Sequence, residues 1–374
     1  MSFSKGRASF TRLAIDDVRL LPFKEFGQEQ LDRLVVYTQT VNGPEVAYCW
    51  GGGDHAHDST FTIEKNVVDN TLAFDLVIVT DRPPPELMRS YYAIELKALA
   101  SANPSGFASA KQKREARQRA RDRIEEAAKD GRFRRRRVVP ILWDLDHAEI
   151  LFGATSAAHL GGFMQLFDRT FGVNLRVLDV DWQTEAISKT YPDLIGEPVP
   201  AFDIVEPAWS DSPLDYLGNE MLMWLWWTSI EVGDTVDLLD ETDLTFMFSK
   251  TLTLDCPRGQ TGKETFTHDS PIRLPESFRG LRSGKRPRRA GLIFVRNNLQ
   301  FEFVLSAEDF SVSGLKLPSP DDDVESVQAQ REHRVAMLRE FLTTVDLLFT
   351  TFLTLRFGPQ WSDVQTSMME WLNG

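Results

Sequence analysis

Three residues have the types and the order that metal-dependent nucleases use. Asp75 precedes Glu95 and Lys97, which form an E-x-K pair. In such enzymes carboxylates hold Mg²⁺ and a lysine assists the attacking water, which requires E-x-K on a strand beside the first acid. Here E-x-K follows the prolines 83–85 within a run, Met88–Ala100, that predicts a helix. Coincidence is therefore the stronger interpretation, and a magnesium-dependent nuclease remains the alternative function.

A second group of residues has the chemistry of an anion-binding surface. The stretch from Lys111 to Arg137 holds 13 Lys and Arg residues against 5 Asp and Glu residues, a local charge of +8. The whole chain carries −13, so the remainder carries −21. An acidic chain is not typical of nucleic-acid-binding proteins, but this asymmetry of sign indicates a localised anionic partner.

The first part of this stretch predicts a long charged helix that ends near Gly131. At 100° per residue, Lys113, Arg114, Arg117 and Arg121 fall within an arc of about 100° that contains no acid. Acidic residues gather on another side, within reach of two further arginines. The members of that side are Glu115, Arg119, Asp122, Arg123 and Glu126. A thin apolar stripe consists of Ala116, Ala120, Ile124 and Ala127. Because alanine buries little area, we expect this helix to project rather than to form a core.

A second basic cluster lies in the segment Gly280–Gly291. It resembles a phosphate-binding loop through Gly284-Lys285, but Arg286 stands where the motif needs a hydroxyl. We therefore expect a basic loop that leads into a strand, either solvated or in contact with phosphates.

The two clusters together give the predicted phosphate contacts. These are Lys111, Lys113, Arg114, Arg117, Arg121, Arg134, Arg135, Arg136, Arg282, Lys285, Arg286, Arg288 and Arg289. Because no motif for reading base edges is present in the sequence, we expect these residues to bind nucleic-acid phosphates without sequence preference.

Other candidate residues favour structural roles. The His55-Ala56-His57 loop after three glycines predicts a turn rather than a metal site. Trp224, Trp226 and Trp227 point in different directions on a helix, which favours burial over stacking on bases. Cys49 and Cys256 have neither zinc-ligand nor disulfide-framework spacing. We expect no catalytic residue, no metal and no cofactor.

The element pattern predicts an α+β fold with mixed antiparallel sheets and long helices. The expected strands are 61–63, 72–79, 138–143, 149–153, 174–180, 245–256, 264–268, 289–295 and 299–305, with turns at Asp69-Asn70 and Asn297-Asn298. The expected helices include 157–171, closed by Gly172, 214–230, and 324–357, whose apolar spacing predicts a core or dimer contact.

Composition places domain boundaries along the chain. We predict an α+β domain over 1–183 with the basic helix, a proline-rich linker over 184–213, a second α+β domain over 214–322 and a C-terminal helical segment over 323–374. The most apolar run, Met221–Trp227, is far shorter than a membrane span of about 20 residues, so we expect a cytoplasmic protein without a membrane segment.

Taken in order, these features resemble the RdgC family of bacterial recombination-associated proteins. Tyr48-Cys49-Trp50-Gly51 resembles the family's aromatic-glycine stretch, and Pro83–Leu99 its proline-initiated helix. The basic helix then follows at the family's spacing. Further matches are 141–144 with 151–152, 171–172 before 175–178, 281–285, the alternating apolar residues 292–305, and 315–317. The resemblance covers most of residues 3–317, whereas 209–227 and 324–374 match poorly.

The resemblance has implications beyond the residues themselves. It implies a non-catalytic homodimer closed into a ring around duplex DNA. It also implies association with the nucleoid and restraint of RecA-type strand exchange.

Overall fold

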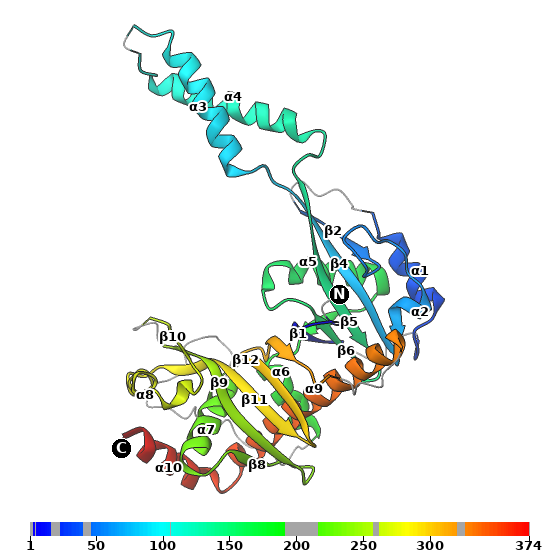
Figure 1. Cartoon of the computed structure of the whole chain (residues 1–374), viewed down its shortest axis with the longest axis vertical. Coiled ribbons are helices and arrows are strands. Elements are labelled where there is room, and N and C mark those ends of the chain that lie inside the picture. Colours follow the sequence, from blue (N-terminus) through cyan, green and yellow to red (C-terminus); the bar gives the residue numbers. More distant parts are fainter. Residues whose placement is uncertain are drawn as a thin grey trace. The chain divides into compact units, whose positions relative to one another are not determined.

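The computed structural model describes residues 3, 5–15, 23–39, 46–104, 106–190, 216–256, 262–319 and 326–373. The chain forms two compact units (Figure 1). Unit 1 comprises Met1–Gln30, Thr62–Phe74 and Pro140–Gly374, and unit 2 comprises Leu31–Phe61 and Asp75–Val139. Helix α1 (Gln28–Val36) and strands β4 (Thr71–Asp81) and β5 (Arg134–Asp144) contribute residues to both.

These units do not coincide with the domain boundaries that composition predicts. Helix α6 (Val180–Thr190) continues through the first residues of the segment expected to be a linker. The rest of that linker, 191–213, lies outside the described residues. Segments expected to belong to separate domains share the sheet of unit 1.

The sheet of unit 1 confirms the α+β class and its antiparallel character. Its main strands run in the spatial order β10 (Glu264–His268), β9 (Asp243–Asp255), β11 (Arg286–Arg296), β12 (Leu299–Ser306), β13 (Val312–Lys316), β1 (Ala8–Ile15), β6 (Glu149–Phe152) and the end of β5. Short strands β3 (Val67–Val68), β7 (Leu175–Val177) and β8 (Thr235–Asp237) pair with β4, β1 and β9.

Strand β1 joins the two halves of this sheet. Its first residues pair with β13 (Ala8 with Leu315), and its last with β6 (Ala14 with Glu149). Most of its side chains are buried on both faces of the sheet, and its backbone pairs with β13 and β6.

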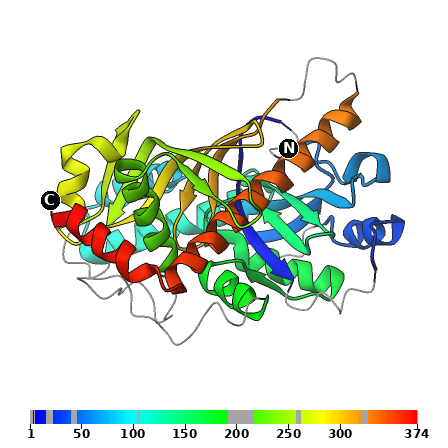
Figure 2. The ribbon, with the colours of Figure 1, turned by 90° about the horizontal axis from the view of Figure 1, so that it is seen from below.

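Helices α7 (Leu217–Glu231), α8 (Pro275–Arg282), α9 (Val327–Phe357) and α10 (Trp361–Asn373) also belong to unit 1 (Figure 2). Phe341 of α9 packs edge-on to Phe303 of β12 at a centroid distance of 4.7 Å. Trp224 and Trp226 are buried in the same core. The structure thus confirms burial of Trp224 and Trp226, whereas Trp227 is only partly buried against this core. It also confirms that the apolar side chains of the long helix are core residues.

Local turn chemistry agrees with the sequence at three points. Asp69-Asn70 and Asn297-Asn298 all have positive φ, as tight hairpin turns require, and Gly172 closes helix α5 (Leu160–Phe171) with φ 68°.

The strand expected over 61–63 is wrong. Thr62 accepts a hydrogen bond from the Lys65 amide and so caps a short helix, α2 (Ile63–Asn66).

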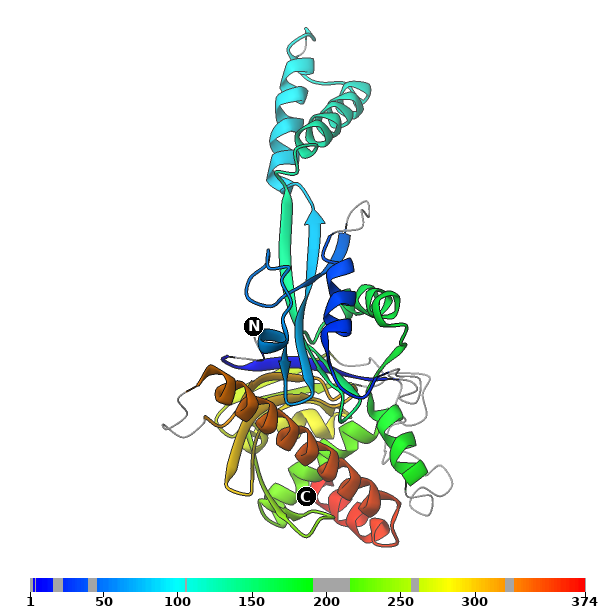
Figure 3. The same ribbon diagram turned by 90° about the vertical axis from the view of Figure 1, so that its right-hand side faces the viewer.

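Unit 2 consists of most of α1, strand β2 (Val46–Gly51), most of β4, the start of β5 and two further helices. β2 pairs with β4 from Val46 opposite Thr80 to Gly51 opposite Asp75. Helices α3 (Pro85–Ala100) and α4 (Ala110–Ala128) lie side by side as a hairpin that follows β4 and precedes β5 (Figure 3). Both helices were expected from the sequence.

A buried ion pair in unit 1 gives a test of its core. Arg356 of α9 is 1% exposed, and its Nε donates to Glu220 Oε2 of α7 at 2.7 Å. We expect Arg356→Ala to lower the free energy of unfolding by about 3–5 kcal/mol, because Glu220 would keep a buried charge without this partner. Urea unfolding followed by tryptophan fluorescence measures the change.

The matched control is the double variant Arg356→Met with Glu220→Leu. Replacing both charges by apolar groups of similar volume should restore most of the stability. A single variant that unfolds like the wild type would show that this pair does not stabilise unit 1.

Candidate nucleic-acid interface

Helix α4 of unit 2 carries the predicted cations on its exposed side. The side chains of Lys111, Lys113, Arg114, Arg117 and Arg121 are all exposed. Ala116, Ala120 and Ile124 are buried, at 0%, 0% and 8% exposure, and form the expected narrow stripe. Because α3 is the helix that packs beside α4 within unit 2, the apolar stripe faces a single neighbour and the basic arc faces solvent.

The start of α4 is fixed by its own sequence. Ser109 accepts a hydrogen bond from the Gln112 amide, while Gln112 Oε1 accepts one from the Ser109 amide at 2.9 Å. This reciprocal capping box satisfies two backbone donors that a helix start would otherwise leave open. The capping box therefore fixes the residue at which α4 begins, and with it the side of the helix on which each basic residue lies.

Glu95 of α3 neutralises one flank of α4. Its Oε1 lies 3.1 Å from Arg123 Nη1, and its Oε2 lies 3.9 Å from Arg119 Nη1. Arg119 also pairs with Glu115 at 2.7 Å. The expectation that these two arginines pair is confirmed, but the partner of Arg123 lies across the hairpin rather than on α4.

The cations on the opposite flank of α4 are not neutralised by acidic side chains. Within the described residues, no acidic side chain forms an ion pair with Lys111, Lys113, Arg114 or Arg121, and Arg117 lies 5.9 Å from the ring centre of Tyr92. From Lys113 to Arg121 the helix rises about 12 Å, which corresponds to three or four base pairs of duplex DNA. The acid-free face of α4, defined as Lys113, Arg114, Arg117 and Arg121, is thus an open cationic surface.

The first residues of β5 add exposed arginines in the same unit. Arg134 to Arg137 are all exposed. Arg134 lies 3.6 Å from Asp81, and Arg136 donates to the Ala56 carbonyl at 3.2 Å.

Arg132 differs from these arginines because it has a close partner. It holds Asp130 through hydrogen bonds that lower the pKa of that carboxyl group, so its charge is balanced locally.

The two units also differ in net charge. Unit 2 contains 17 Lys and Arg residues against 13 Asp and Glu residues, a net charge of +4, which leaves −17 for unit 1. The cationic surface of α4 therefore belongs to the one unit whose net charge is positive.

The second basic cluster, in unit 1, is largely engaged inside its own unit. Lys285 is 4% exposed and pairs with Glu264 at 2.5 Å, and Arg286 is 7% exposed. Arg288 pairs with Asp255 and Glu308; burial alone would lower its pKa, but these partners raise it.

Two further arginines of this cluster also make internal contacts. Arg282 Nε donates to the Leu372 carbonyl at 2.8 Å, and Arg289 Nη2 donates to Ser313 Oγ at 3.0 Å. The basic loop expected over 280–291 is instead the end of α8, a short turn and β11. Phosphate contact by this cluster stays a prediction.

The residues of the nuclease alternative lie on different elements. Asp75 is buried in β4, whereas Glu95 and Lys97 lie on helix α3, as the sequence indicates. Glu95 is occupied by Arg119 and Arg123. Within the described ranges no group of three potential metal ligands occurs.

The glycine-histidine loop is a turn organised by Asp58. The two carboxylate oxygens of Asp58 each accept a backbone hydrogen bond at 3.0 Å, from Asp54 and from Thr60. His55 Nδ1 accepts from the His57 amide, so this ring is also part of the turn.

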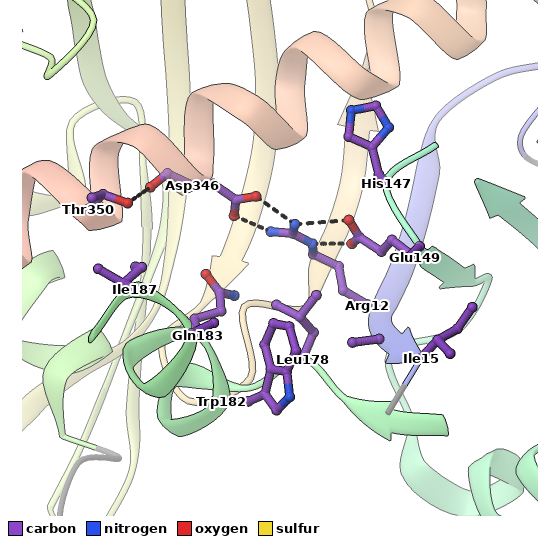
Figure 4. A pocket seen from close by; sticks show the side chains of 13 residues that line it. Arg12, Ile15, His147, Glu149, Leu178, Trp182, Gln183, Ile187, Asp346 and Thr350 are labelled. Atoms are coloured by element: carbon purple, nitrogen blue, oxygen red, sulfur yellow. Dashed lines mark hydrogen bonds and ion pairs between the residues drawn. The ribbon is translucent and has the colours of Figure 1, made fainter. Parts of the chain in front are cut away.

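A cavity of about 470 Å³ in unit 1 contains a charged cluster of a different kind (Figure 4). Arg12 donates to both carboxylate oxygens of Glu149 and to both of Asp346. Burial alone would lower the pKa of Arg12, but Asp346 and Glu149 raise it well above its usual range. Two carboxylates therefore balance this guanidinium, and the cavity does not match a phosphate ligand.

Comparison with known proteins adds no assignment. No protein-family model matches the chain, and no curated protein sequence matches it significantly. Among the described residues no single helix is long and apolar enough to cross a membrane; α9 and α10 would be so only together, and they meet at a bend of 98°.

The packing of α3 on α4 can be tested at Ala120. Ala120→Asp would place a carboxylate at a position that is 0% exposed, and an unpaired buried charge is costly. We expect trypsin to cut the basic residues of α4 at least about tenfold faster in this variant, because the hairpin opens. Glu125→Asp, at an exposed position of the same helix, is the control. Equal cleavage of Ala120→Asp and wild type would argue against this packing.

Proposed function

We propose that the protein binds double-stranded DNA without sequence preference, through the acid-free face of α4 and the exposed arginines at the start of β5. The single observation that carries the proposal is this cationic face in a chain whose net charge is −13. Its members are exposed, and no acidic side chain in the described residues pairs with them.

The chemistry of these side chains suits phosphate. A guanidinium can donate two parallel hydrogen bonds to phosphate oxygens, and a lysine adds a compact charge. Each neutralised phosphate releases condensed counterions, which makes binding strong at low salt and weak at high salt. Contacts of this kind fix position on the duplex and carry no sequence information.

We extend the proposal to an RdgC-like role. In this role the protein forms a homodimer that encircles duplex DNA at the bacterial nucleoid and restrains RecA-type strand exchange by occupying the DNA. Support comes from the shared order of segments, which here form β2, α3, α4 and the pair β11–β12.

Charge reversal of the acid-free face tests DNA binding. We expect K113E, R114E, R117E and R121E combined to abolish retardation of a duplex at 50 mM salt. Variants with fewer of these changes should flatten the slope of log affinity against log salt by about 0.9 for each phosphate that the protein no longer neutralises. Fluorescence anisotropy over a salt series measures both effects.

The matched control reverses four exposed cations of unit 1, namely Lys24, Arg176, Lys189 and Arg273, for the same change in net charge. Circular dichroism checks that both variants fold. Unchanged affinity after reversal of the α4 face would exclude it as the contact. Plasmid cleavage with Mg²⁺ that Glu95→Ala abolishes would instead establish the nuclease.

The proposed ring has a separate test. We expect sedimentation to give twice the chain mass without DNA, and the bound protein to resist dissociation from a closed circular plasmid more than from the same plasmid after linearisation. An encircling dimer can slide off a free end but not off a circle. A monomeric mass, or equal dissociation from both DNAs, would contradict the ring without affecting the α4 contact.

A further inference from the structure

The loop that joins α3 to α4 presents an aromatic side chain to solvent. Phe107 is 81% exposed, more than any other large apolar side chain in the described residues. The α3–α4 loop lies at the end of the hairpin that is away from β4 and β5 (Figure 3). An exposed aromatic ring favours contact with an apolar partner, because its contact with water is unfavourable.

Side-chain amides hold this loop in place. Asn103 Nδ2 donates to the Phe107 carbonyl and to Gln112 Oε1, both at 2.7 Å. Gln112 Nε2 donates to the Leu99 carbonyl at 3.2 Å, which links the loop to the end of α3. Gly106 has φ 69°, a conformation that glycine adopts readily, and its amide donates to the Asn103 carbonyl at 3.0 Å. The Phe107 carbonyl and the Gly106 amide are therefore both hydrogen-bonded to Asn103.

The surroundings of Phe107 are cationic. Lys111, Lys113 and Arg114 follow within seven residues and are exposed, and no acidic residue lies between Phe107 and Arg114. A second copy of the same loop would bring like charges together, which is unfavourable. An apolar ring beside cations instead complements a polyanion with an apolar interior, and stacked base pairs between two phosphate backbones have this character.

We propose that Phe107 inserts between neighbouring base pairs of the bound duplex and bends it, while the adjacent lysines hold the flanking phosphates. This inference rests on the proposed DNA binding and adds a wedge to it. Apolar side chains inserted at a base step partly unstack the bases and kink the duplex by about 20–90°. Insertion is least costly at flexible pyrimidine–purine steps such as TA, so the bend should depend on DNA flexibility although no base edge is read.

The test uses the full chain and a short duplex with one central TA step, in which 2-aminopurine replaces the adenine. Terminal dyes report bending by energy transfer. Wild-type protein should raise 2-aminopurine emission, since unstacking relieves quenching, and should increase energy transfer. Phe107→Ala should abolish both signals and weaken binding about tenfold, while the salt slope stays unchanged because the phosphate contacts remain.

Two further variants make the result specific. Phe107→Leu keeps an apolar wedge and should retain most of the unstacking signal. Ile94→Ala removes another exposed apolar side chain of the same hairpin, 53% exposed on α3, and should behave as wild type.

The outcomes separate the two proposals. If wild type shows salt-dependent binding but neither unstacking nor bending, the wedge is wrong and the α4 contact stands. Phe107→Ala that keeps both signals, or that changes only the sedimenting mass, also overturns the wedge, the latter in favour of a contact between copies. If wild type binds no duplex at any salt concentration, both proposals fail.

Discussion

Unit 1 depends on the ion pairs that the buried Arg12 guanidinium forms with Glu149 and Asp346. Arg12 lies on β1, and its two carboxylate partners come from β6 and α9, so one side chain ties the joining strand of the sheet to a neighbouring strand and to the longest helix. A charge in such a place is tolerated only when its donors are matched, because desolvation is costly. Arg12 makes four charged hydrogen bonds, and its raised pKa keeps it protonated.

In the α3–α4 hairpin of unit 2, by contrast, most cationic side chains are exposed rather than buried. Alanine fills two of the three buried positions of α4, so little surface is removed from water and the long cationic side chains stay solvated. Glu95 neutralises only the flank that carries Arg119 and Arg123. In unit 1 arginine serves as an internal connector, whereas on the acid-free face of α4 it stays exposed to solvent.

The sequence predicts local features well and distant pairings poorly. Helices α3, α4 and α9 and the turns at Asn70 and Asn298 follow from periodicity, prolines and turn residues that act within a few positions. The basic cluster around Lys285 gives no local sign of burial, because its partners, among them Glu264 and Glu308, are distant in sequence. Strand β1 is not predicted from alternating polar and apolar residues, because its side chains are buried on both faces of the sheet.

The candidate site shows the same division. The acid-free face of α4 and the pairing of Arg119 are readable from helical geometry alone. The partner of Arg123 is not, because it comes from the other helix of the hairpin. Phe107 had a readable signal that sequence reasoning missed: a lone aromatic residue in a loop of small residues, just before a run of lysines.

The position of β1 also sets the order in which the chain can fold during synthesis. Unit 2 is complete once residue 139 has left the ribosome, so the hairpin can form early. The edge of β1 at Ala8 gains its partner Leu315 only after about 300 further residues, and Asp346 reaches Arg12 later still. Contacts of such long range close slowly, and a nascent chain that waits for them keeps an open strand edge. Strand β1 is therefore a segment that chaperone binding during translation would protect from aggregation.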